Sequence, residues 1–311
     1  MRRRYKWLIG LIAAIGVPYY WLLIDNRPGG DPGPRVRIAE LRRLAAEVRG
    51  AKPESVRMHT VAWRRVPGVL FVAGGGLKRN LLGIESYTLG GPWGRIVIDS
   101  GLRRADAEAM GLERFFPAEQ AQVDADLRAA RRIVFTHEHL DHINGFLRLP
   151  DFARVAGQAL VTPEQAPGGA FTYDLPWPAA SRTALHPFRY RGLAPVAPGV
   201  VLIRTPGHTP GSQMIFVTMA DGREILFAGD TATMARSWQQ LRARSRLVGD
   251  FLVGEDRAAV FGWLKTIRAL KRDAPGLIIV AGHDPDQIIA THRKNRFVLD
   301  DAAPPAAAPA R

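Results

Sequence analysis

Three histidines and two acidic residues fall within six consecutive positions, 137–142, of this sequence (HEHLDH). Only eight histidines occur in the 311 residues, so three of them in one short segment indicate a shared role. Imidazole nitrogens and carboxylate oxygens are the ligands that zinc and similar divalent ions take in proteins. The segment therefore predicts a metal site, and the alternative is a surface loop that is merely rich in histidine.

Three more residues of the same ligand types each lie beside a glycine: His208, Asp230 and His283. Glycine lets the backbone approach closely and frees the neighbouring side chain to point into a cleft. With the three histidines and Asp141 of segment 137–142 they make seven ligands, which two metal ions need if one carboxylate bridges them. The remaining histidines lack this setting and are interpreted as ordinary surface or core residues: His59, His186 and His292.

A pair of divalent ions favours hydrolytic chemistry. Two ions about 3.5–4 Å apart lower the pKa of a shared water toward neutrality and so provide hydroxide. One ion also polarises a carbonyl group and holds the oxyanion that develops. Asp141 or Asp230 is expected to accept and return a proton during catalysis. Iron accepts the same ligands, so an oxidative or sulfur-handling enzyme stays open as an alternative.

Short apolar runs precede the candidate ligands and predict strands that deliver them at their carboxyl ends. Asp99 ends one such run, and a strand-end aspartate taken alone more often caps a loop than binds metal. The irregular segment 150–198 is a candidate for a substrate-facing insert, and no single substrate contact is predicted. The expected strands are 69–72, 85–89, 95–98, 133–135, 200–204, 214–218, 224–228 and 277–280, and the expected helices are 36–48, 118–132, 143–149 and 258–271.

Residues 1–26 have the composition of a membrane anchor. A basic cluster precedes 18 uncharged residues, 7–24, which span about 27 Å as a helix. A cleaved signal peptide is the alternative, but the apolar run ends without small residues of the Ala-x-Ala kind. Positive charge before the span keeps that end cytoplasmic, so we expect the body on the extracytoplasmic side of an inner membrane, the periplasmic side in a bacterium. The expected order is the anchor 1–26, a Gly/Pro linker 27–35, a catalytic body 36–300 and a disordered tail 301–311.

Composition limits the remaining possibilities. The chain has no cysteine, which excludes a disulfide, a thiolate ligand and a cysteine nucleophile, without indicating a compartment. The net charge of +14 comes from scattered arginines without interleaved aromatic residues, so we do not expect nucleic acid as a partner. We expect a small-molecule substrate and contact with a membrane through the N-terminal helix. The oligomeric state is not indicated.

The ligand pattern resembles the metallo-β-lactamase-fold hydrolases over residues 60–295. The resemblance rests on His-x-His-x-Asp-His, a histidine in a Pro-Gly-His turn, then Gly-Asp and Gly-His. It implies one four-layer αβ/βα sandwich and two divalent metal ions, which we expect to be zinc. It assigns His137, His139 and His208 to the first ion, Asp141, His142 and His283 to the second, Asp230 to both, and Asp99 to bracing the ligand loop.

Ligand spacing most resembles the N-acyl homoserine lactonase-like branch. One position departs from it, because those lactonases usually have a tyrosine three residues after the bridging aspartate, where this chain has Thr233. We therefore expect a dinuclear zinc hydrolase that acts on an ester or lactone. The alternatives are a β-lactam or thioester (glyoxalase II-like) hydrolase and a catalytically silent metal-binding sensor module. Nuclease activity is less expected, because the late inserted domain of such branches is missing.

Overall fold

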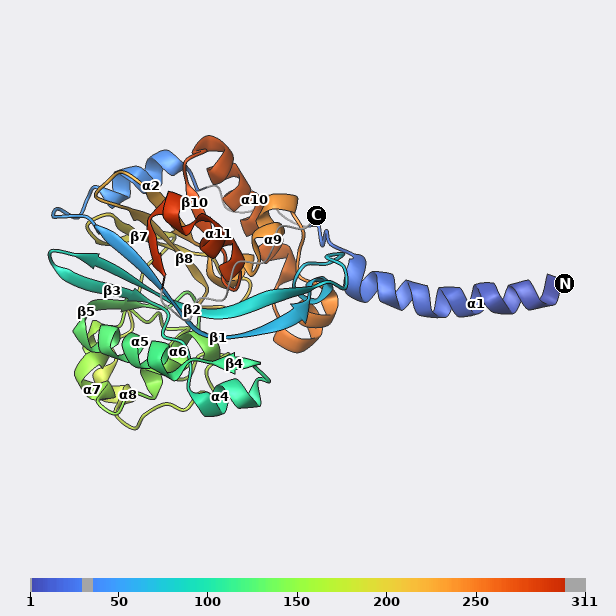
Figure 1. The fold of residues 1–311 in the computed structure, drawn as a ribbon, viewed down its shortest axis with the longest axis horizontal. Coiled ribbons are helices and arrows are strands. Elements are labelled where there is room, and N and C mark those ends of the chain that lie inside the picture. Colours follow the sequence, from blue (N-terminus) through green and yellow to red (C-terminus); the bar gives the residue numbers. More distant parts are fainter. Residues whose placement is uncertain (1, 30–35, 300–311) are drawn as a thin grey trace.

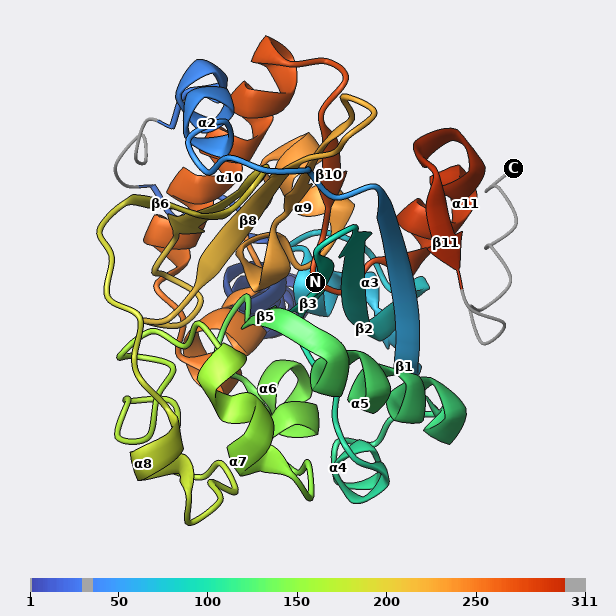
Figure 2. The ribbon, with the colours of Figure 1, turned by 90° about the vertical axis from the view of Figure 1, so that its left-hand side faces the viewer.

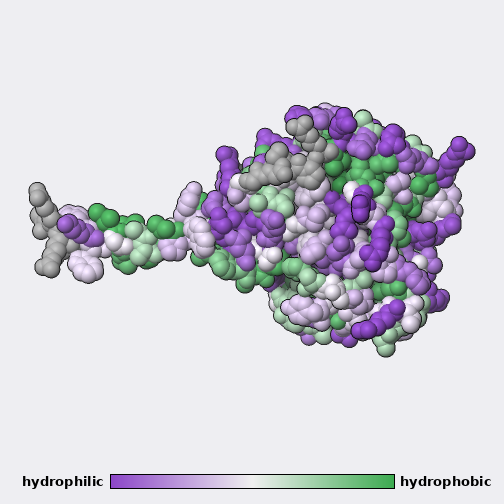
Figure 3. Space-filling view, turned by 180° about the vertical axis from the view of Figure 1, so that it is seen from behind, coloured by the Kyte–Doolittle hydropathy of each residue, from purple (hydrophilic) through white to green (hydrophobic). Residues whose placement is uncertain are grey.

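The computed structural model describes residues 2–29 and 36–299. Most of the expected linker 27–35 and all of the expected tail 301–311 lie outside these residues. Helix α1 (Arg2–Tyr19) continues as a π-helical turn, η1 (Tyr20–Ile24), and projects from the body (Figure 1). The span Tyr5–Ile24 is long and apolar enough to cross a membrane, by length and composition only. Figure 3 shows hydrophobic surface along this helix.

The body contains two sheets. The first has the strand order β11-β1-β2-β3-β5, with the short β4 paired to β1. Strands β1, β2 and β3 are antiparallel neighbours, whereas β5 is parallel to β3 and β11 is parallel to β1. The strands are β1 (Ser55–Pro67), β2 (Arg79–Gly91), β3 (Gly94–Ile98), β4 (Arg114–Phe115), β5 (Ala130–Val134) and β11 (Phe297–Leu299).

The second sheet has the strand order β10-β9-β8-β7-β6. Its strands β6 to β9 form an antiparallel meander, and β10 adds parallel to β9 after a long helix. The strands are β6 (Leu193–Ala197), β7 (Val200–Arg204), β8 (Gln213–Thr218), β9 (Glu224–Phe227) and β10 (Ile278–Val280).

Helices cover the outer faces of both sheets. Figure 2 shows α2 (Ile38–Ala45) and α10 (Arg257–Asp273) on the side of the second sheet, and α5 (Pro117–Ala129) and α6 (Leu140–Leu147) on the side of the first. The arrangement is the mixed α/β sandwich that the sequence predicts. The other helices are α3 (Gly68–Phe71), α4 (Arg104–Ala109), α7 (Phe152–Val155), α8 (Ser181–Ala184), α9 (Ala235–Gln240) and α11 (Pro285–Asn295).

Alternation along β8 explains how the sheets stack. Met214 and Phe216 point to the outer face and join the apolar cluster that α2 and α10 complete. Ile215 and Val217 point to the inner face and join a cluster with Ile98 of the first sheet. Successive side chains of a strand face opposite ways, so an uninterrupted apolar run can bury both faces of the second sheet.

Several expected elements have other bounds in the structure: the strand expected at 85–89 extends over 79–91, and the helix expected at 36–48 covers 38–45. Residues 69–72 were expected as a strand, but residues 68–71 form α3 inside the loop that joins β1 to β2, since a four-residue apolar run does not distinguish helix from strand. The helix expected at 118–132 ends at Ala129, because residues 130–134 pair with β3. The helix expected from residue 143 already begins at Leu140.

Candidate metal centre

The seven candidate ligands gather at one edge of the sandwich, where strands of both sheets end. They come from the loop after β5 (His137, His139), the first turn of α6 (Asp141, His142), the turn after β7 (His208), the turn η3 (Gly229–Ala232) after β9 (Asp230) and the loop after β10 (His283). Because β5 belongs to the first sheet and β7, β9 and β10 to the second, the donors meet only when the two sheets pack together.

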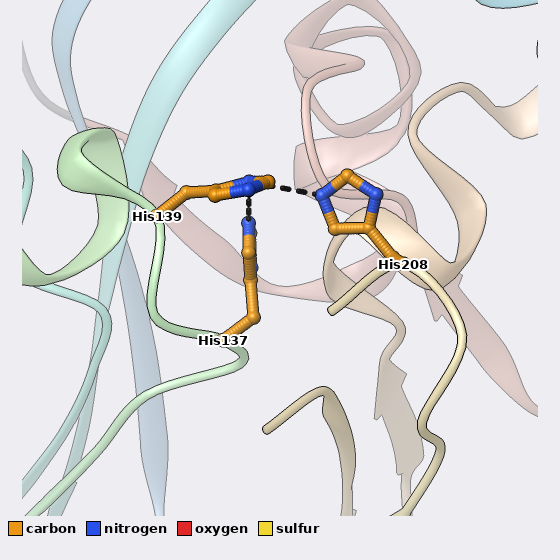
Figure 4. A group of neighbouring side chains, drawn as sticks. All are labelled: His137, His139 and His208. Atoms are coloured by element: carbon orange, nitrogen blue, oxygen red, sulfur yellow. Dashed lines mark hydrogen bonds between the residues drawn. The ribbon is translucent and has the colours of Figure 1, made fainter. Parts of the chain in front are cut away.

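The first group consists of His137, His139 and His208. Figure 4 shows the three rings converging on one point. The His139 Nδ1 atom lies 3.0 Å from His137 Nε2 and 3.0 Å from His208 Nε2. The rings of His137 and His208 are buried, whereas His139 is half-buried and so borders the solvent side of the group.

The second group consists of Asp141, His142 and His283. The Nε2 atoms of His142 and His283 lie 3.3 Å apart. The Asp141 Oδ2 atom lies 3.7 Å from His142 Nε2 and 3.5 Å from His283 Nε2. Asp141 stands in the first turn of α6, where the partial positive charge of the helix N-terminus stabilises its carboxylate.

Asp230 lies between the two groups. Its Oδ2 atom is 3.4 Å from His208 Nε2 in the first group, and its Oδ1 atom is 3.1 Å from His283 Nε2 in the second. The side chain is buried, and Gly282 allows this packing because a Cβ there would lie 2.4 Å from Asp230 Oδ1. One carboxylate therefore presents a separate oxygen to each group.

The spacing of the donor atoms fits metal ions better than hydrogen bonds. A ring nitrogen carries one lone pair or one proton, so His139 Nδ1 cannot serve two partners at 3.0 Å equally well. Four ligands placed tetrahedrally about 2.0–2.1 Å from a zinc ion lie about 3.3 Å from one another. The observed separations of 3.0 to 3.7 Å are close to this value. The donor set thus fits a cation in each group.

The protonation states of the ligands differ between the two groups. Burial, together with neighbouring imidazoles, holds the pKa of His137 well below its usual value and lowers that of His139 to about 3, so both rings are neutral at pH 7. Burial acts to raise the pKa of Asp230, but nearby His283, His208 and Arg244 bring it well below its usual range. Burial lowers the pKa of His283, yet the Asp230 carboxylate outweighs this and raises it to about 10. Asp230 therefore draws positive charge to His283, and a metal ion that binds there replaces the proton.

Asp99 holds the ligand loop from behind. Its Oδ1 accepts a hydrogen bond from the Thr136 backbone N–H at 2.7 Å, and its Oδ2 accepts one from the Thr136 hydroxyl at 2.8 Å. The same Oδ2 lies 2.8 Å from His142 Nδ1. With Nδ1–H donating to this carboxylate, the Nε2 lone pair of His142 faces the second group.

His208 and His283 each have a hydrogen-bond partner at Nδ1, as His142 does. His208 Nδ1 lies 3.0 Å from Glu255 Oε2, and His283 Nδ1 lies 2.6 Å from the Gly83 carbonyl oxygen. Each contact fixes the ring and directs its Nε2 toward the centre. Glu255 is buried in the loop before α10, and no motif in the sequence identifies it.

Arg244 is a second residue at the centre that no motif in the sequence identifies. Its buried guanidinium lies 3.1 Å from Asp230 Oδ2 and 3.1 Å from Glu255 Oε2, and it donates to the Thr233 hydroxyl. Thr233 occupies the position where the sequence departs from the lactonase pattern. Arg244 stands in a loop among other arginines, so its type and spacing give no signal.

The three histidines interpreted as ordinary do not join either group. His59 is buried and lies 3.2 Å from Glu119 Oε2 and 3.3 Å from Asp126 Oδ2, neither of which is a candidate ligand. His186 is exposed and His292 is half-buried.

A cavity of about 570 Å³ lies against the two groups. It is bounded by His139 and Asp141 and by apolar side chains that include Phe171 and Leu252. Phe171 comes from the irregular segment 150–198, the candidate for a substrate-facing insert. The cavity is thus lined mainly by apolar side chains and borders one donor residue of each group.

Comparisons with known proteins place the chain in a family. The family model described as the metallo-beta-lactamase superfamily matches residues 81–283, which contain all seven candidate ligands. The N-acyl homoserine lactonase AttM of Rhizobium radiobacter is 27% identical over 164 residues, which span 50% of this chain and 58% of that protein.

Solved structures agree in fold. A quorum-quenching N-acyl homoserine lactone lactonase matches 80% of this chain and 98% of its own with a TM-score of 0.60 at 16% identity. The dizinc quorum-quenching lactonase AidC, solved with the product N-hexanoyl-L-homoserine, matches 76% of this chain and 90% of its own with a TM-score of 0.51 at 12% identity. These identities are low enough that the likeness concerns the fold. With the family model covering most of the body, the chain belongs to the metallo-beta-lactamase superfamily.

Proposed function

We propose that this protein is a hydrolase that uses two divalent metal ions, zinc in our expectation, to open an ester or lactone. The observation that carries the proposal is the position of Asp230, which presents one oxygen to each of two groups of three donors. A carboxylate placed in this way suits two ions close enough to share a water. Membership of the superfamily supports hydrolysis as the reaction class.

The side chains of the chain divide the work. The first group, the second group and Asp230 hold the ions, which when bound supply a hydroxide at neutral pH and polarise the substrate carbonyl. Asp141 and Asp230 are the residues that we expect to move the proton, since the pKa of each is lowered despite burial and both are carboxylates at pH 7. Asp99 and Glu255 keep the ligand histidines in the tautomer that binds metal.

The proposed substrate class follows from the relatives and from the cavity. The matched relative is an N-acyl homoserine lactonase, and the cavity beside the ligands is mainly apolar. The hydroxyl of Thr233 accepts a hydrogen bond from Arg244 and donates one to the Asp230 carbonyl oxygen at 3.5 Å, so both its donor and its acceptor are engaged. We therefore expect this chain to position a carbonyl differently from a lactonase that has a tyrosine at that position.

We further propose that residues 1–26 anchor the protein in a membrane and that residues 36–300 form one catalytic body. The 20-residue span Tyr5–Ile24 has a mean hydropathy of 1.9, and its apolar part is not buried inside the protein. The basic cluster before the span favours a cytoplasmic N-terminus, and we therefore propose that the body lies outside the cytoplasm.

The test is a substrate panel with metal analysis on the same sample. Full-length protein in detergent, loaded with zinc, is assayed against acyl homoserine lactones, p-nitrophenyl esters, nitrocefin and acyl-glutathione thioesters. We expect close to two metal equivalents and turnover of esters or lactones. Turnover confined to nitrocefin or to thioesters would move the assignment to the β-lactam or thioester alternative.

Asp230→Asn separates catalysis from a structural metal role. We expect this variant to lose turnover while it retains a cooperative thermal transition, because the amide keeps the shape of the side chain. Asp126→Asn is the matched control, since it alters a buried aspartate outside the two groups and should keep turnover. Metal binding without turnover of any substrate in the panel would favour the sensor alternative.

A further inference from the structure

Exposed apolar side chains lie at the base of the N-terminal helix and on the two segments that contact it. Trp21, Leu77, Phe251 and Leu252 are 46%, 72%, 60% and 72% exposed, which is high for large apolar residues. The Trp21 and Phe251 rings meet edge to face with centroids 5.9 Å apart. Leu77 stands in the loop after α3, and Gly74 of that loop donates a hydrogen bond to the Leu23 carbonyl at 2.8 Å. We call these four residues the apolar rim.

The end of the helix is fixed to the catalytic body. The Asp25 carboxylate pairs with Arg246 at 2.6 Å, and Arg257 donates to the Asp25 carbonyl at 2.8 Å. Ala243 donates to the Asn26 carbonyl at 3.1 Å. These contacts come from residues 243–257, and the Gly74 contact adds the loop after α3, so both segments that carry rim residues are tied to the end of the helix.

The length of the helix sets the depth of the rim. The 20 residues of Tyr5–Ile24 cover about 30 Å, the thickness of a bilayer hydrocarbon core. A helix that crosses the membrane therefore ends near the interface, where tryptophans such as Trp21 concentrate. Lys78 follows Leu77 and is exposed, as suits a cation at headgroup level. The two acidic residues beside the rim, Asp25 and Asp250, are both paired with Arg246, at 2.6 Å and 3.1 Å.

The rim adjoins the entrance of the candidate active site. The turn η4 (Leu247–Val253) carries Phe251, which contacts Trp21, and also Leu252 and Val253, which line the 570 Å³ cavity beside His139 and Asp141. One short segment thus forms part of the surface at the helix base and part of the cavity wall. Figure 1 shows the base of α1 against the body at this end.

We propose that the apolar rim inserts into the bilayer interface and that the cavity takes its substrate from there, as an ester or lactone with a long acyl chain dissolved in the membrane. This rests on the proposed hydrolase function. The acyl chain passes along Leu252 and Phe171 while the carbonyl reaches the donor atoms, so the molecule never has to enter water. A fully water-soluble substrate would gain nothing from an entrance on this face.

Insertion of the rim is tested without any assay of activity. Because the chain has no cysteine, a single introduced cysteine can carry a polarity-sensitive fluorophore without background. Full-length Leu77→Cys is labelled and reconstituted in vesicles of phosphatidylcholine and phosphatidylglycerol that contain a lipid with a nitroxide near the headgroup. Val298→Cys is the matched control, since Val298 is 41% exposed and lies on β11 in the body. We expect blue-shifted emission and at least fivefold stronger quenching for the label at position 77. Equal, water-like emission from both labels would overturn the proposal.

The substrate class is tested by comparing hydrolysis of a soluble ester with hydrolysis of an ester carried in vesicles. The double variant Leu77→Ser and Phe251→Ser alters rim residues that do not line the cavity. We expect unchanged turnover of a short, soluble ester and at least a tenfold loss for a long-chain ester carried in vesicles, with Val298→Ser equal to wild type on both. An equal effect on both substrates would refute uptake from the bilayer. Absence of any esterase or lactonase turnover in wild type would instead refute the hydrolase function, while the quenching result would still report on insertion.

Discussion

Asp99→Asn is the substitution that best separates geometry from charge in the candidate centre. The carboxylate accepts the Thr136 N–H at 2.7 Å and faces His142 Nδ1 at 2.8 Å. Asparagine has the same shape and tolerates the left-handed conformation of this residue, whose φ is 59°. Its side-chain oxygen can still accept the hydrogen bond from the Thr136 N–H, but its amide nitrogen then faces His142 Nδ1 and can only donate a hydrogen bond. The His142 ring must move its proton from Nδ1 to Nε2, the nitrogen that faces the second group.

The expected magnitude follows from the loss of this tautomer. Replacing a partner that orients a ligand histidine typically weakens metal binding by about 10- to 100-fold, or about 1.4–2.8 kcal/mol. Because His142 belongs to the second group, one metal equivalent should weaken by this factor and the other should stay tight. Glu255→Gln is the mirror experiment, since Glu255 faces His208 Nδ1 at 3.0 Å and His208 belongs to the first group.

The assay is a zinc titration against a chromophoric chelator of known affinity. Asp126→Asn serves as the control, because it also removes a buried carboxylate that contacts a histidine, His59, yet lies outside both groups. It should bind two equivalents as wild type does. The reasoning is refuted if Asp99→Asn and Glu255→Gln both titrate like Asp126→Asn, because the ring orientation would then not depend on these carboxylates.

Three further outcomes are expected. Arg244→Met should destabilise the metal-free protein by about 3–5 kcal/mol in urea unfolding, since it removes the guanidinium that the buried Asp230 and Glu255 share, and by less with zinc bound; an equal loss in both forms would contradict this. Zinc at about a hundred times its dissociation constant should stabilise the chelator-treated protein by about 2.7 kcal/mol per site in thermal melts, whereas unchanged melting would argue against metal binding to the folded state. Burial raises the pKa of Asp126, but the hydrogen bond with His59 and other contacts bring it below its usual value. The ionised Asp126 therefore stabilises the folded protein above the unfolded pKa near 4, and this stabilisation is lost as the pH falls through the folded pKa. Melting temperatures from pH 7 to pH 3 should therefore fall less steeply for Asp126→Asn than for wild type.

Residue types and their local spacing were enough to indicate which side chains would meet. The cluster at 137–142 and the glycine-flanked His208 and His283 are visible because a ligand needs a short turn after a strand, and that turn leaves a local signature. The structure brings them together in two groups. The strand expected at 69–72 was wrong, because the antiparallel pairing of β1 with β2 already ends at Pro67 and leaves the apolar run in a loop.

Arg244 and Glu255 show the limit of such reasoning. Arg244 contacts Asp230 and His208, and Glu255 contacts His208. These partners are distant in sequence, so the neighbours of Arg244 and Glu255 along the chain do not reveal their role. A buried charge leaves no periodic pattern, and arginine is common in this chain. Their positions follow only once the second sheet and the loop before α10 are placed in space.

Each group of donors draws on both sheets: the segment after β5 supplies two ligands to each, and the second sheet supplies one, with Asp230 shared. Bound ions would therefore cross-link the two halves of the polypeptide and close loops that run from position 137 to beyond position 280. The two sheets could separate only after coordination bonds break. The metal-bound protein should therefore resist slow unfolding and proteolysis far longer than its equilibrium stability alone would suggest.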